Sequence, residues 1–372
     1  MQSDRATGAA SESPPSPSGR GETARLLVLV PSLSTASFRY RLEPLLAYLE
    51  GVGVEAEVAP LGRGVGGGLA RYLGYLAAGA YDGVYLQRKL LDRVQWWVLR
   101  KRAKKLIFDF DDAVMYHHQI DEAGRPHQSR EDRFRRVVGE ADVVIAGNSY
   151  LEELARPWAA DVRRMPTPVD TDRFRPRGEP PGEPPVVGWV GSRSTTRYLK
   201  PLRGVFAELR MRRPGLVVRI IADRFPLWME EADLETGPWR AEREVAEIGS
   251  FTVGLMPLAD DVWTRGKCAF KILQYGACGV PAVASPVGMN VEAVEPDVTG
   301  RFAASPEEWV EAIVSIVADP EGRRRMGEAA RAKMEAEYSV KLWGPRWAAW
   351  ILEALTGRTA DRRVSGPASS SE

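Results

Sequence analysis

Short apolar runs alternate with helical stretches along most of this chain. The runs before residue 175 lie at positions 26–30, 83–86, 106–110 and 143–146. After a Pro- and Gly-rich break they resume at positions 186–191, 216–222, 253–258 and 281–285. Buried parallel strands separated by helices produce this pattern. The sequence therefore predicts an α/β protein with two Rossmann-like, doubly wound domains that face a cleft.

The break itself divides the chain into domains. Residues 175–185 read RPRGEPPGEPP, a composition typical of a linker. We place the first domain at 23–176, the linker at 177–185, the second domain at 186–340 and a last helix at 341–357. The tails 1–22 and 358–372 are rich in Ser, Pro, Gly and Ala, have little to bury, and are predicted to be disordered.

Charge and cysteine content exclude several classes of protein. The chain has 51 Lys and Arg against 50 Asp and Glu, a formal charge of +1, so no basic excess points to nucleic acid. Cys268 and Cys278 lie ten residues apart, and on one helix that spacing is about 15 Å, too far for a disulfide. No apolar run reaches the roughly 20 residues of a membrane span, and no apolar signal segment is apparent. We therefore expect free thiols and a cytoplasmic protein.

The segment from Thr264 to Asn290 (TRGKCAFKILQYGACGVPAVASPVGMN) carries the most specific pattern. Lys267 and Lys271 are four residues apart at the start of a predicted helix, so they share one face. A helix N-terminus favours anions, and the two lysines together can hold a diphosphate. The alternative is a pair of solvated surface lysines.

The same segment resembles the donor-binding region of glycosyltransferase family four, which contains retaining enzymes of the GT-B fold. It is similar to a bacterial branch written GKCxFKxLQYMAxGxPVVASPVGxN, with Gly276 in place of the usual methionine. Further matches are ADVVIAGNSYLEELA from residue 141, PTPVDTDRFRP from residue 166 and VVGWVGS from residue 186. With FDFDDA and SFRYR, the resemblance covers about residues 25–356.

This resemblance implies an activity and a site. The implied reaction is hexosyl transfer from a UDP- or GDP-linked sugar to an acceptor hydroxyl with retention, in cell-surface glycan or natural-product synthesis, without metal or cofactor. It needs a stabilised leaving diphosphate more than a protein nucleophile. The last helix would cross back to the first domain. The implied donor-binding residues are Gly191, Ser192, Arg193, Arg197, Gln274, Gly288, Met289 and Asn290, and the implied catalytic residues are Lys267, Lys271, Asp111 and Asp112.

Apart from Gly276, the chain departs from the family at four positions. Most members carry two glutamates separated by seven residues, and these align with Gly266 and Gln274. Gln274 can still hydrogen-bond a ribose hydroxyl, whereas Gly266 cannot replace a carboxylate. The usual arginine aligns with Ser192, and the usual lysine falls near Tyr198. Arg193 or Arg197 is the expected substitute.

Two first-domain loops follow predicted strands and supply further candidates. Arg39 and Arg41 follow the first strand and are expected to contact the donor diphosphate or an anionic acceptor. Their alternative is pairing with acidic neighbours such as Glu43.

A second loop, at the end of another predicted strand, carries Asp109, Asp111 and Asp112, with His117 and His118 beyond. Taken alone, these residues would also fit a metal site or an acid–base pair. The resemblance favours carboxylates that orient an acceptor or sugar hydroxyl.

Residues 88–105 (RKLLDRVQWWVLRKRAKK) form a basic amphipathic stretch with the predicted apolar face Leu90, Leu91, Val94, Trp97 and Val98. Either this face packs on the sheet, or the helix makes peripheral contact with a membrane. The second case would suit a lipid-linked acceptor; a glycan or a small molecule is equally compatible with the sequence. Two other functions remain open, a non-catalytic binding or scaffold subunit and a nucleotide-sugar 2-epimerase.

Overall fold

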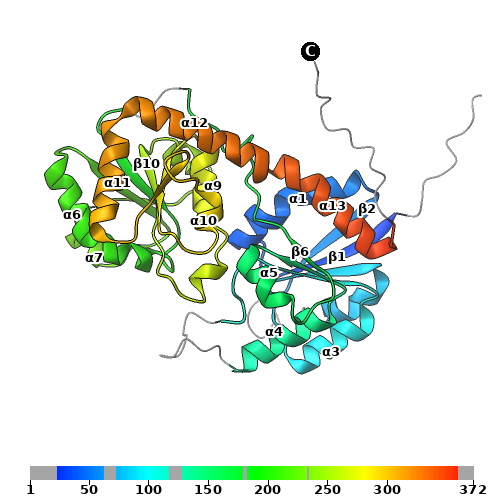
Figure 1. Cartoon of the computed structure of the whole chain (residues 1–372). Coiled ribbons are helices and arrows are strands. Elements are labelled where there is room, and N and C mark those ends of the chain that lie inside the picture. Colours follow the sequence, from blue (N-terminus) through cyan, green and yellow to red (C-terminus); the bar gives the residue numbers. More distant parts are fainter. Residues whose placement is uncertain (1–22, 63–72, 117–127, 179–181, 233, 359–372) are drawn as a thin grey trace, which may run out of the picture.

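The computed structural model describes residues 23–62, 73–116, 128–178, 182–232 and 234–358, which form two α/β units (Figure 1). Both tails predicted to be disordered lie outside this range, apart from Arg358. The first unit holds a six-stranded parallel sheet in the order β2-β1-β3-β4-β5-β6. Its strands are β1 (Ala24–Val30), β2 (Val54–Pro60), β3 (Gly83–Gln87), β4 (Leu106–Phe110), β5 (Val143–Ala146) and β6 (Val162–Arg164). Its helices are η1 (Ser37–Leu42), α1 (Glu43–Glu50), η2 (Ala78–Ala80), α3 (Arg93–Arg102), α4 (Gln128–Glu140) and α5 (Ser149–Ala155).

The second unit repeats this architecture with a different strand order, β12-β11-β10-β7-β8-β9, again all parallel. Its strands are β7 (Val186–Val190), β8 (Val217–Ala222), β9 (Glu235–Pro238), β10 (Val253–Met256), β11 (Ala282–Ala284) and β12 (Gly300–Phe302). Its helices are η3 (Thr196–Leu202), α6 (Arg203–Arg212), α7 (Trp228–Glu231), α8 (Glu244–Ile248), η4 (Thr264–Gly266), α9 (Phe270–Ala277), α10 (Asn290–Ala293), α11 (Pro306–Ala318) and α12 (Pro320–Glu337). The predicted fold class is confirmed.

Strand order determines where each sheet can bind a ligand. In the first sheet the winding direction reverses between β1 and β3, and in the second it reverses between β7 and β10. Open α/β sheets bind ligands at such a reversal, beyond the carboxyl ends of the strands. The loops after these four strands are therefore the positions at which to look for a site.

The last helix, α13 (Val340–Thr356), lies on the first unit (Figure 1). Trp347 is fully buried there, and its ring meets that of Tyr85 edge-on at a centroid distance of 5.7 Å. Gly83 has no side chain, which leaves room for Leu355. Trp343 and Trp350 are partly buried at the margin of the same cluster. The helix thus links the end of the second unit to the core of the first.

Helix α3 corrects the predicted apolar face of residues 88–105. Trp96 and Leu99 are buried against the sheet, whereas Val94 and Trp97 are 61% and 63% exposed. Apolar residues lie around most of the circumference of this helix, so the sequence pattern did not determine which side packs against the sheet. No helix in the described ranges is both long and apolar enough to span a bilayer.

Candidate functional site

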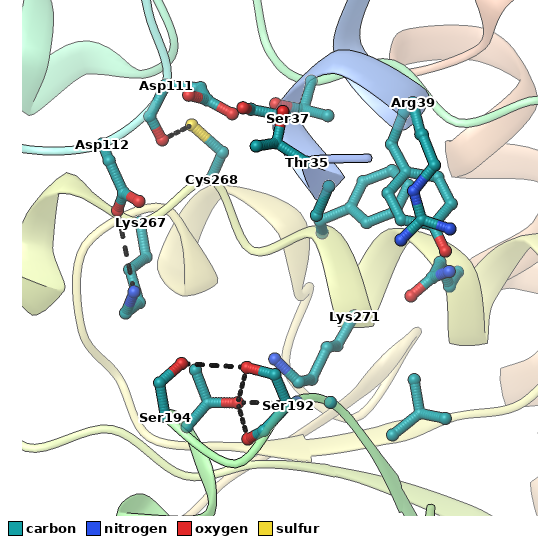
Figure 2. Close-up of a pocket in the computed structure, with 18 of the residues that line it drawn as sticks. Thr35, Ser37, Arg39, Asp111, Asp112, Ser192, Ser194, Lys267, Cys268 and Lys271 are labelled. Carbon is teal, nitrogen blue, oxygen red and sulfur yellow. Dashed lines mark hydrogen bonds and ion pairs between the residues drawn. The ribbon is translucent and has the colours of Figure 1, made fainter. Parts of the chain in front are cut away.

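A cavity of about 870 Å³ lies between the two units, a size typical of small-molecule sites. Loops after β1, β3 and β4 line it on the first unit. Loops after β7, β8, β9 and β10, together with the start of α9, line it on the second. All four strands at the two reversals therefore contribute to one cavity, and Figure 2 shows its lining.

The second unit contributes Lys267 and Lys271 to the cavity. Between them Ala269 adopts left-handed backbone angles (φ +48°), uncommon for a residue with a side chain, and α9 starts directly after it. Lys271 lies with its ammonium 5.3 Å from the Trp189 ring centroid, and loss of solvent together with the nearby Lys267 lowers its pKa to about 8. Figure 2 shows Lys271 beside the loop after β7, whereas Lys267 extends toward Asp112 at 3.6 Å. The two cations therefore have different surroundings.

A hydroxyl-rich loop faces Lys271 (Figure 2). It follows β7 and contains Ser192, Ser194 and Thr195, all of which line the cavity. The Oγ atoms of Ser192 and Ser194 lie 2.9 Å apart, and the Ser192 amide donates to Thr195 Oγ1 at 3.1 Å. A side chain at Gly191 would collide with the Trp189 ring. Sequence reasoning named Gly191 and Ser192 but missed the two hydroxyls after them, although the run SRSTT after a strand was a usable signal.

The first unit contributes Asp111 and Asp112, both engaged with Arg88. Arg88 Nε lies 3.3 Å from Asp111 Oδ1, and Nη2 donates to Asp112 Oδ2 at 2.7 Å. Arg88 also has left-handed backbone angles (φ +58°), a local strain of a kind found at functional sites. Burial raises the pKa of Asp111, and the positive charge of Arg88 partly offsets this rise. On this wall of the cavity one guanidinium therefore holds two carboxylates.

A third group at the cavity centres on Glu244, which is only 2% exposed. Its Oε1 accepts hydrogen bonds from Tyr40 Oη at 2.7 Å, Trp239 Nε1 at 3.1 Å and Gln274 Nε2 at 3.1 Å. Arg39 stacks over the Trp239 ring with its guanidinium carbon 4.7 Å from the centroid. The group joins first-unit and second-unit residues. Arg39 and Gln274 were candidates from the sequence, whereas Glu244 carried no signal because it looks like an ordinary residue of a charged helix.

Arg41 and Asp109 require a correction. Both side chains are completely buried and do not line the cavity. Arg41 Nε and Nη2 donate to Asp109, with Nη2 at 2.7 Å, and Nη1 donates to the Met165 carbonyl. Burial opposes the charged form of Arg41, but the Asp109 carboxylate raises its pKa above the ordinary value. This pair holds η1 against the first sheet and lies outside the cavity lining. Glu43, the neighbour considered from sequence, is not the partner of Arg41.

Five predicted donor-site residues do not line the cavity. Arg193 and Arg197 are exposed, and Arg197 donates to the Tyr198 hydroxyl instead. Gly288 lies against the backbone of Arg265. Met289 and Asn290 are buried, and the Asn290 amide donates to the Ser285 carbonyl at 2.9 Å. Asn290 thus braces the loop after β11 from outside the cavity lining.

Gly266, at the position of a family glutamate, sits where the units touch. A β-carbon there would lie 2.6 Å from Ala113 Cβ and 2.8 Å from the Ala113 amide nitrogen. Nearby, the Asn148 amide donates to the carbonyls of Arg265 and Lys267, and Cys268 Sγ donates to the Asp111 carbonyl. The close contact between the units explains why no side chain fits at position 266.

The remaining expectations concern metals and thiols. Within the described part of the chain, no three His, Cys, Asp or Glu side chains gather so as to hold a metal ion. His117 and His118 lie outside the described residues. Cys268 and Cys278 are both buried and free.

Comparison with known proteins supports the family resemblance. The "Glycosyl transferase-like" family model matches residues 200–349. D-inositol 3-phosphate glycosyltransferase of Segniliparus rotundus is 25% identical over 241 residues, which are 53% of this chain and 51% of that protein. The chain thus matches about half the length of this curated relative.

Solved structures show the same fold. Sucrose-phosphate synthase from Thermosynechococcus elongatus superposes with a TM-score of 0.73 at 16% identity, covering 90% of this chain and all of the other. The structure of Anabaena Alr3699/HepE in complex with UDP-glucose superposes with a TM-score of 0.65 at 14% identity. The match covers 89% of this chain and 100% of the other.

Proposed function

We propose that this chain is a GT-B glycosyltransferase of the family-four-like group. On this proposal it transfers a hexose from a nucleotide diphosphate sugar to an acceptor hydroxyl with retention. UDP-glucose, held by a structural relative, is the first donor to test, and GDP-linked sugars come next. The observation that carries the proposal is a single cavity at the reversal points of both sheets, with two lysines and a hydroxyl loop on one wall.

The donor diphosphate is assigned to the second-unit wall. Lys271, Lys267 and the loop Ser192–Thr195 supply two cations and three hydroxyls around one space (Figure 2). When the sugar–phosphate bond breaks, negative charge grows on the leaving diphosphate, and fixed cations in a site poor in water stabilise it strongly. The hydroxyl loop takes the place of the arginine that family members carry at Ser192.

The nucleoside is assigned to the group around Glu244. Trp239 offers an aromatic surface, and the carbonyl of Gln274 can accept a hydrogen bond from a ribose hydroxyl. Glu244 Oε1 already accepts three hydrogen bonds, but its Oε2, which accepts one from Arg173 Nη2 at 3.1 Å, can accept one more. Glu244 would supply there the carboxylate that the chain lacks at position 274. Its contact with Tyr40 ties the nucleoside end to the first unit.

The acceptor is assigned to the first-unit wall. Asp111 and Asp112, held by Arg88, face the lysines across the cavity and can orient an acceptor or sugar hydroxyl. The departing phosphate takes the proton of that hydroxyl, so neither carboxylate has to act as a base. The acceptor class stays open between a glycan, a lipid-linked sugar and a small molecule. Two buried free thiols fit a cytoplasmic setting.

Calorimetry with UDP-glucose, other UDP sugars and GDP-mannose, followed by a hydrolysis assay on each binder, tests the proposal. We expect micromolar binding of one sugar nucleotide and slow hydrolysis without acceptor. Binding with no turnover, even with a panel of acceptors, would favour the scaffold alternative. If no sugar nucleotide binds, the assignment is wrong.

A further inference from the structure

Helix α3 presents apolar and basic side chains to solvent on one face. Val94 is 61% and Trp97 63% exposed, one turn apart on the helix. Arg93, Lys101 and Arg102 are exposed beside them. The opposite face carries the buried Trp96 and Leu99, and Asp92 caps the helix. The core packing of this helix therefore does not use its outer residues. We call these outer residues the α3 face: Arg93, Val94, Trp97, Lys101 and Arg102.

The charge of this face is not cancelled locally. Neighbouring cations do find partners, since Arg100 and Lys105 pair with Asp142 and Lys104 pairs with Asp82. Across the described parts of the chain, Arg93, Lys101 and Arg102 form no ion pair. The whole chain has a formal charge of only +1, so the positive potential here is local rather than general.

We propose that the α3 face docks on the surface of an anionic phospholipid bilayer. Tryptophan favours the boundary between headgroups and acyl chains, where its ring is buried and its N–H stays hydrated. Basic residues at an anionic surface each strengthen binding by about fivefold. A helix lying in the plane of the membrane would bury Val94 and Trp97 and place the three cations at headgroup level.

This face begins close to the cavity. Arg88 lines the cavity, and Arg93 opens α3 five residues later, a chain distance of at most about 18 Å. A membrane against α3 would therefore lie near the first-unit wall. The docking itself does not depend on the proposed sugar transfer, although it would bring a lipid-linked acceptor to that wall.

Sedimentation of the full chain with vesicles tests the proposal. We compare vesicles of 70% phosphatidylcholine and 30% phosphatidylglycerol with pure phosphatidylcholine. The parent should sediment with the anionic vesicles and lose most of this binding at high salt, because screening weakens surface attraction. Arg93→Gln/Lys101→Gln should reduce the partition coefficient roughly 25-fold, two factors of about five. Val94→Ser/Trp97→Ser should also reduce it at least tenfold, about the effect of withdrawing an exposed Trp from the interface.

Matched controls lie on the second unit. Leu227 is 76% exposed, so Leu227→Ser removes an exposed apolar residue elsewhere. Arg213→Gln/Arg224→Gln removes two exposed cations that also form no ion pair within the described ranges, and it changes net charge equally. Both should bind vesicles like the parent, and every variant should keep its melting temperature and its affinity for sugar nucleotides.

Three results would overturn the proposal: no binding to anionic vesicles, equal binding to neutral vesicles, or α3-face variants that bind like the controls. Preferential binding of a DNA or RNA duplex that competes with the vesicles would assign the face to nucleic acid instead. Because sugar-nucleotide affinity is measured in the same variants, failure of the docking proposal is distinguishable from failure of the proposed function.

Discussion

The two walls of the cavity use charge differently. On the first-unit wall, and in the layer behind it, Arg41 pairs with Asp109 and Arg88 pairs with both Asp111 and Asp112. On the second-unit wall, Lys271 has an aromatic ring and hydroxyls nearby and a pKa lowered to about 8. Lys267 has one carboxylate at 3.6 Å.

This difference separates positioning from binding. Cations that already have carboxylate partners contribute little new attraction to an anion, whereas a cation held without one gains most when an anion arrives. Apart from Arg39, which stacks on Trp239, the cations of the first wall hold its shape, and we propose that the second wall receives the diphosphate. Four experiments test this contrast.

The largest effect is expected for Arg41→Met. Removing one member of a fully buried ion pair leaves Asp109 charged and unpaired, which typically costs 3–5 kcal/mol of stability. Urea denaturation followed by circular dichroism measures the loss. The double variant Arg41→Met/Asp109→Leu should recover most of it, since no buried charge remains. A loss below about 1 kcal/mol would show that Arg41 is not a structural residue.

The pair of Arg41 and Asp109 also shows which features could not be predicted from the sequence. The two sheets were predictable because strand and helix periodicity is local. Arg41 and Asp109 are separated by 68 residues, and Tyr40 and Glu244 by 204, so only the folded chain brings them together. Lys267, Lys271 and Gln274 were identified because they lie in one continuous motif. Adjacent residues of one helix can also be assigned to the wrong face. Trp96 is buried and Trp97 is exposed, and a shift of the helix face by one residue would exchange them.

The next effect is on turnover. Lys271→Met should fold like the parent and lose about 10²–10³ in kcat, because one charge that stabilises the leaving group is gone. Lys267→Met should lose less, since Asp112 already offsets part of that charge. Lys200→Met, at an exposed lysine outside the cavity, is the control. Equal losses at positions 267 and 271 would remove the distinction between the two lysines, and near-parent turnover in both would place the diphosphate elsewhere.

A smaller effect is the pH dependence of donor binding. In the free protein Lys271 has a pKa of about 8, below its ordinary value, and a bound diphosphate would raise it again. Affinity for a UDP sugar should then be constant below pH 7 and fall about tenfold between pH 7 and 9, as the free ammonium loses its proton. Lys271→Arg stays charged throughout and should give a flat profile by calorimetry. A parent profile as flat as that of the variant would contradict this role.

The smallest change is expected from chelation, and it tests the contrast between the walls most directly. If Lys267 and Lys271 supply the positive charge for the diphosphate, turnover should stay within about twofold of the parent rate in excess EDTA, since a twofold change corresponds to only about 0.4 kcal/mol in the barrier. Asp111 and Asp112 are the carboxylates placed to recruit a divalent ion, but Arg88 already occupies both. A metal would have to displace that guanidinium, at the cost of two charged contacts. Loss of turnover on chelation, restored by Mg²⁺ or Mn²⁺, would mean that the Arg88 pairs open in the working enzyme. The first wall would then take part in binding the donor, and the division between a positioning wall and a binding wall would not hold.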